Sequence, residues 1–145
     1  MPESVYFVHA AQPSSALAGI HEHLIEHIHK RGLAVIEYDP RTSGADQSGD
    51  EQWAGLAASR AVIAELSEAD ETVRPPLERA LQIGKPVLAL YNVYLTSSSK
   101  PAVNLSDLLV TRSQRYSRLF VARVRIDMFM EVNAGYRVPL SGSAD

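Results

Sequence analysis

Apolar runs alternate with amphipathic stretches along most of this chain. Short runs rich in β-branched and aromatic residues predict buried strands, and they lie at residues 4–9, 33–38, 61–66, 87–91 and 119–124. Apolar residues at helical spacing predict helices between the first four strands, at residues 14–30, 49–59 and 76–83. This alternation indicates a mostly parallel sheet with helices on both faces. We therefore predict a doubly wound, five-stranded α/β domain of the Rossmann or flavodoxin-like type.

The end of the chain is less regular. A short helix is expected at residues 105–110, capped by Asn104, and a helical stretch at residues 128–136. The polar tail 139–145 is expected to be disordered, which leaves residues 1–138 as the single domain.

Composition narrows the function classes. The chain has 145 residues, 46% of them hydrophobic, enough for one domain with a real core. Its net charge is −3 with scattered Lys and Arg, so a nucleic acid polymer is not an expected partner. It has no cysteine, no signal-peptide pattern and no apolar run that would span a bilayer. We expect a soluble, cytoplasmic protein without membrane contact.

The loop and helix start at residues 65–78 are the expected ligand region. In an open parallel sheet, ligands bind in the crevice outside the carboxyl ends of the strands. His9 directly follows the first strand, and Tyr6 lies within it as a core residue or a ligand contact. The next segment, HAAQPSS, lacks the glycines of a phosphate-binding loop, which disfavours dinucleotide binding and P-loop hydrolysis. We predict no cofactor.

Carboxylates gather where the crevice should open. They belong to Asp50, Glu51, Glu65, Glu68, Asp70, Glu71 and Glu78. A partly desolvated carboxylate can act as a nucleophile or general base. Alternatively, those near helix starts only favour the positive end of the helix.

A histidine cluster, HEHLIEHIH, spans residues 21–29. His23, Glu26 and His27 match the H-x-x-E-H pattern of a zinc site. However, the segment is a predicted crossover helix, and no third ligand is identifiable. We predict no metal, and a metal-dependent function is the most distant alternative.

Several segments together resemble the nucleoside 2-deoxyribosyltransferase-like superfamily, especially the 2'-deoxynucleoside 5'-monophosphate N-glycosidases. They are VYFVH, WAGLAASRAVIAEL, LERALQIGKPVLALY and NLSDLLV. The resemblance implies a homodimer that acts on a nucleoside or nucleotide. A glutamate would attack the anomeric carbon to form a covalent glycosyl-enzyme intermediate. Water then gives hydrolysis, and a second base gives transfer.

The chain departs from the family at its functional positions. The family's nucleophilic glutamate falls on Pro76, so Glu78 is the nearest candidate. The sugar-orienting aspartate falls on Gln52, beside Glu51 and Asp50. The serine and arginine that hold the 5'-phosphate fall on Ala10 and Gln12. Ser106 is retained and would reach the neighbouring subunit's site.

Two hypotheses follow. In the first, the chain is an N-glycosidase or deoxyribosyltransferase in which Glu78 is the nucleophile and Glu51 or Asp50 orients the sugar. Tyr6, His9 and Glu65 would then line the pocket. In the second, it is a catalytically degenerate relative that serves as a nucleotide-binding or interaction module.

Overall fold

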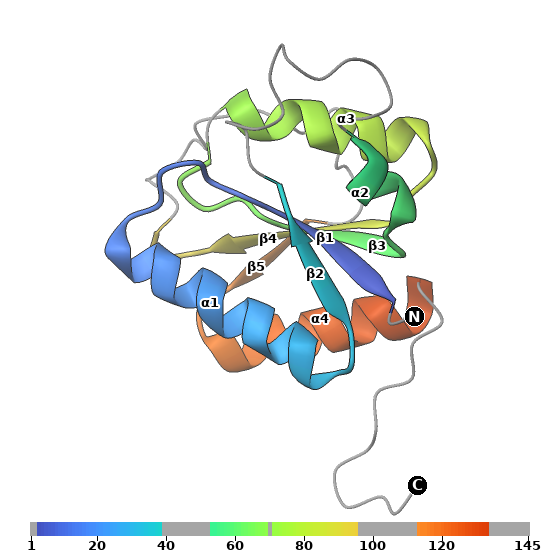
Figure 1. The fold of residues 1–145 in the computed structure, drawn as a ribbon. Coiled ribbons are helices and arrows are strands. Elements are labelled where there is room, and N and C mark those ends of the chain that lie inside the picture. Colours follow the sequence, from blue (N-terminus) through green and yellow to red (C-terminus); the bar gives the residue numbers. More distant parts are fainter. Residues whose placement is uncertain (1–2, 39–52, 70, 96–112, 134–145) are drawn as a thin grey trace, which may run out of the picture.

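The computed structural model describes residues 3–38, 53–69, 71–95 and 113–133, which form a five-stranded sheet between two helical layers (Figure 1). The strands are β1 (Ser4–His9), β2 (Ala34–Glu37), β3 (Ala61–Glu65), β4 (Val87–Asn92) and β5 (Ser113–Tyr116). The helices are α1 (Ser15–Lys30), α2 (Ala54–Ala58), α3 (Arg74–Gln82) and α4 (Leu119–Asn133), with a 3-10 turn at Glu71–Val73. The sheet order is β2-β1-β3-β4-β5 and every pairing is parallel, which confirms the predicted fold class.

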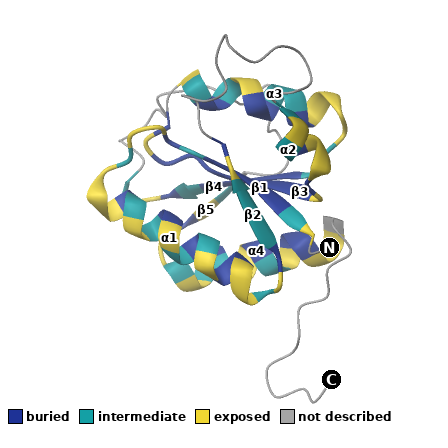
Figure 2. Cartoon of the chain, viewed as in Figure 1, coloured by how far each residue is buried: buried dark blue, intermediate teal, exposed yellow. Residues whose placement is uncertain are grey.

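Successive strand residues point to opposite faces, which gives the sheet two cores. Tyr6 and Val8 of β1 pack with α2 and α3, whereas Val5 and Phe7 pack with α1 and α4. Every residue of β3 is buried, as expected for a central parallel strand covered on both sides (Figure 2). None of the described helices is long and apolar enough to cross a membrane.

The start of α1 matches its sequence signal. Ser14 is the N-cap, and its hydroxyl accepts a hydrogen bond from the Leu17 backbone N–H at 3.3 Å. Beyond the helix, Gly32 has a φ of +82°, a conformation that glycine adopts without steric cost. The cap and this glycine therefore set the limits of the first crossover.

The prolines that open α3 also behave as predicted. Pro75 and Pro76 lie in its first turn, where backbone N–H groups have no partner within the helix. Pro76, Leu77 and Ala80 are buried against the sheet. The position that a family nucleophile would occupy is thus part of the core.

The predicted fifth strand at residues 119–124 is wrong, because this run begins α4. Its buried residues, Ala122, Ile126, Phe129 and Met130, recur at helical spacing rather than alternating. The helix predicted at residues 128–136 therefore starts nine residues earlier. The actual last strand, β5, has the polar sequence SQRY and pairs with β4 alone among the described strands. The helix predicted at 105–110 and the tail at 139–145 lie outside the described residues.

Candidate functional site

A buried carboxylate lies at the carboxyl edge of the sheet. Glu65, the last residue of β3, is fully buried. One of its oxygens accepts the Ser67 backbone N–H at 2.8 Å. The other accepts the Ser67 hydroxyl at 2.9 Å and the Tyr116 hydroxyl at 2.5 Å. These hydrogen bonds replace the hydrogen bonds to water that the carboxylate loses on burial.

Tyr116 is fixed as a hydrogen-bond donor to Glu65. Burial first, and then the negative charge of Glu65, raise the pKa of the Tyr116 phenol far above its ordinary value. The phenol therefore stays protonated. The Ser67 hydroxyl also accepts the Asn92 backbone N–H at 2.7 Å. This network, comprising Glu65, Ser67, Asn92 and Tyr116, ties together the ends of β3, β4 and β5.

Two histidines lie beside this network. His9, at the end of β1, is in register with Glu65 on β3. Its ring nitrogens contact the Ala10 carbonyl at 2.8 Å and the Glu37 carboxylate at 3.2 Å. The ring of His21 from α1 lies against that of His9, with centroids 4.5 Å apart. The buried Nε2 of His21 has no hydrogen bond and lies 3.9 Å from a Glu65 oxygen.

An aromatic row occupies the opposite face of the sheet. The Tyr6 ring packs against Tyr38, with centroids 6.3 Å apart, and Tyr38 stacks on Trp53 at 6.3 Å and 16°. Tyr38 directly follows β2, so this row extends from β1 to the carboxyl end of β2. Strand alternation therefore separates Tyr6 from His9, although both were expected to line one pocket.

The buried Tyr6 phenol predicts alkaline destabilisation. Burial, reinforced by Tyr38, raises its pKa from 10.0 to about 12. The unfolded chain then loses this proton first, so stability that is present below pH 10 is lost as pH rises toward 12. At about 1.4 kcal/mol per pKa unit, Tyr6 contributes about 2–3 kcal/mol to that loss. Urea unfolding of the parent and Tyr6→Phe across this range should show a shallower decline for the variant, and equal slopes would contradict it.

Glu68 occupies the amino end of α1. Its carboxylate accepts the Ser14 backbone N–H at 2.8 Å and the Ser14 hydroxyl at 2.7 Å. Glu68 has a φ of +60°, a conformation that costs a non-glycine residue about 1–2 kcal/mol. The amino end of a helix attracts anions. The chain's own carboxylate therefore takes a position where an anionic ligand group would otherwise bind.

The other predicted site residues are scattered. Glu78 lies on α3 with its side chain 46% exposed, and its carboxylate is 3.4 Å from the Arg74 guanidinium one turn earlier. Ala10 is buried and Gln12 is exposed. Glu51, its neighbours Asp50 and Gln52, and Ser106 all lie outside the described residues. The proposed roles of these residues remain predictions.

The histidines of α1 are divided between different partners. His23 contacts Arg123 at 3.4 Å, and His27 contacts Asp127 at 2.9 Å. Among the described residues, no group of three or more His, Cys, Asp or Glu side chains could hold a metal ion. The helical spacing indicates that His21 is a buried histidine of this cluster, because it lies on the same face as Leu17, Leu24 and Ile28.

Two solved structures are similar to this chain. A diflavin flavoprotein A3 from Nostoc sp. has a TM-score of 0.56 and 11% identity, covering 93% of this chain and 92% of that one. The fold is flavodoxin-like. A 2-deoxyribosyltransferase from Bacillus psychrosaccharolyticus has a TM-score of 0.52 and 14% identity, covering 83% of this chain and 90% of that one. No protein-family model and no curated protein matches the sequence. At such low identity, the likeness establishes the fold.

Proposed function

We propose that this chain is a nucleoside-binding protein of the nucleoside 2-deoxyribosyltransferase-like superfamily, which holds its ligand without cleaving it. The sequence resemblance and the shared fold of the Bacillus deoxyribosyltransferase support the ligand class. The proposal that the ligand is not cleaved depends on one observation. The carboxylates near the ligand edge whose contacts are described interact with other groups of the chain.

A glycosidase nucleophile must present a free lone pair to the anomeric carbon. Glu65 is fully buried and accepts three hydrogen bonds. Glu68 is bound to Ser14, and Glu37 contacts His9. Glu78 pairs with Arg74 on the outer surface of α3, about 200° around the helix from the buried Pro76. These contacts favour binding without cleavage, because each of the four carboxylates already interacts with a group of the chain.

The ligand would bind in the crevice between β1 and β3. In this strand order the chain leaves β1 for β2 on one side and places β3 on the other, which opens the crevice at their carboxyl ends. His9 lies there and is partly exposed, and the Tyr38–Trp53 stack lies at the carboxyl end of β2, on the other side of β1. The negative charge of Glu68 disfavours a phosphate at the start of α1. A nucleoside without a 5'-phosphate is therefore the better match.

One panel of ligands tests this proposal. Trp53 is the only tryptophan and stacks on Tyr38, so its fluorescence would report a ligand that reaches this stack. We expect one or more ribo- or deoxynucleosides to change that fluorescence and raise the melting temperature, because a ligand that binds only the folded state stabilises it. Chromatography of the same mixtures should detect no free base. A panel without any binding would reject the proposal.

Release of free base would instead support the second candidate, an N-glycosidase or deoxyribosyltransferase. It is favoured by the position of Glu78 in the helix that follows the β3 loop and by the activity of the Bacillus structural neighbour. With Glu78 as nucleophile and Glu51 orienting the sugar, Glu78→Gln should abolish release. Glu22→Gln, a change at an exposed glutamate of α1, should leave it intact.

A further inference from the structure

Helix α4 exposes a row of large apolar side chains. Phe120, Val124, Met128 and Val132 follow one another at four-residue spacing, with exposures of 63%, 37%, 54% and 76%. We call these four residues the α4 ridge. Residues four apart on a helix are neighbours, so the ridge is continuous. Monomeric proteins rarely expose a contiguous apolar surface of this kind without a partner.

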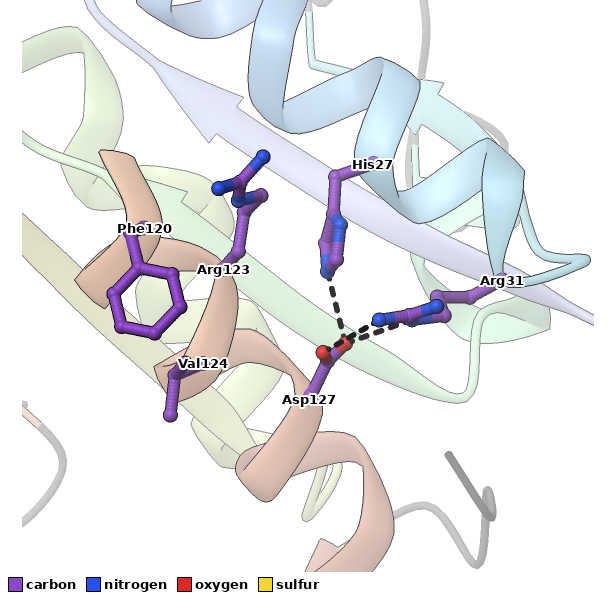
Figure 3. A pocket seen from close by; sticks show the side chains of 6 residues that line it. All are labelled: His27, Arg31, Phe120, Arg123, Val124 and Asp127. Atoms are coloured by element: carbon purple, nitrogen blue, oxygen red, sulfur yellow. Dashed lines mark hydrogen bonds and ion pairs between the residues drawn. The ribbon is translucent and has the colours of Figure 1, made fainter. Parts of the chain in front are cut away.

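A polar row follows one side of the ridge at the same spacing. It comprises Arg123, Asp127 and the exposed Glu131. Asp127 is bound by His27 and Arg31 at 2.9 and 3.0 Å across a groove of about 320 Å³ between α1 and α4 (Figure 3). Arg123 contacts the His23 ring, and no carboxylate among the described residues pairs with it. The row thus offers an arginine at one end and a glutamate at the other.

We propose that a second copy of this chain packs on the α4 ridge, with the two α4 helices antiparallel about a two-fold axis beside Asp127. Asp127 lies midway between Arg123 and Glu131, so it faces Asp127 of the partner subunit across the axis, and its charge is already paired with Arg31 and His27 of its own copy. In this register, Arg123 of one copy therefore lies opposite Glu131 of the partner subunit, and the reverse contact forms by symmetry. Ridges at four-residue spacing interdigitate in the commonest mode of helix packing.

Charge complementarity decides between a second copy and another occupant. A copy of the chain matches both ends of the polar row and covers the apolar ridge at once. A small anion in the groove would satisfy Arg123 but leave Phe120, Met128 and Val132 in water. The ridge belongs to the α1 side of the sheet, so pairing leaves the α2 and α3 side uncovered. The proposal is independent of the proposed ligand.

Light scattering and sedimentation of the full chain test the interface. At a protein concentration of about 100 μM, we expect a mass of about twice 15.9 kDa. Met128→Glu places a charge in the ridge and should give a monomer. Leu81→Glu changes an apolar residue of α3 that is 40% exposed, and it should remain a dimer. A monomeric parent protein, or a Met128→Glu variant that stays dimeric and folded by circular dichroism, would overturn the proposal.

Charge exchange tests the register. Arg123→Glu and Glu131→Arg should each weaken dimerisation about three- to tenfold, because each creates two like-charge contacts. The double variant restores both pairs in reversed order, so its dissociation constant should return toward that of the parent. Single variants without effect would show that the helices do not pair in this way. So would a double variant whose loss of dimerisation free energy equals the sum of the two single losses.

Discussion

Replacement of Glu65 by alanine is expected to destabilise the fold by about 3–5 kcal/mol, a large share of the stability of a domain this size. The change removes an acceptor from the Ser67 backbone N–H, the Ser67 hydroxyl and the Tyr116 hydroxyl. All three groups are buried, and each costs about 1–3 kcal/mol if left unpaired. Denaturant unfolding monitored by circular dichroism measures the loss.

Two variants separate this network from the general effect of losing a glutamate. Glu65→Gln keeps one acceptor for the Ser67 N–H, and the two hydroxyls can rotate to accept from the new amide, although their own protons lose an acceptor. It should therefore cost about 1–3 kcal/mol, less than Glu65→Ala. Glu37→Ala removes the glutamate that ends strand β2, on the other side of β1 from Glu65. The Glu37 side chain is 54% exposed, so this substitution should cost less than about 1 kcal/mol. A Glu65→Ala loss as small as that of Glu37→Ala would refute the account.

Removal of the Glu68 charge is expected to change which ligand binds. If the chain binds a nucleoside at the carboxyl edge, Glu68→Gln should raise the affinity for its 5'-monophosphate about tenfold while changing nucleoside affinity little. The reason is that the helix amino end then attracts phosphate without competition from a carboxylate. Titration of Trp53 fluorescence with both ligands measures the ratio.

Glu71→Gln is the matched control for this change. Glu71 is an exposed glutamate of the same loop, so its substitution by glutamine removes the same single negative charge. It should leave the ratio of the two affinities within about twofold, because exposed charges at a distance are screened. Equal gains in monophosphate affinity for both variants would show that net charge, rather than the Ser14 contact, sets the preference.

Most of the architecture could be predicted from local patterns. β1, α1 and β3 are where apolar spacing places them, because burial on both faces of a parallel sheet leaves a strong signal in the sequence. α4 was misassigned at its start because the letters LFVARV fit a strand as well as a helix. β5 gave no signal at all, since its four polar residues form a strand only by pairing with β4.

The candidate site was predicted in part. Parallel strands all end at one edge, which was enough to place His9 and Glu65 side by side. The hydrogen-bond partners of the carboxylates could not be predicted from sequence. Glu65 meets Tyr116 across 51 residues, and Glu68 meets Ser14 across 54.

The sequence by itself determined the fold class, the crossover helices and the edge where a ligand should bind, because these depend on short-range periodicity. Only the tertiary structure decided which carboxylates bind the chain itself, which face Tyr6 joins and that α4 leaves an apolar ridge exposed. Those outcomes depend on contacts between segments far apart in the chain. No local pattern encodes such contacts, since each residue's partner is chosen when the sheet and its helices pack together.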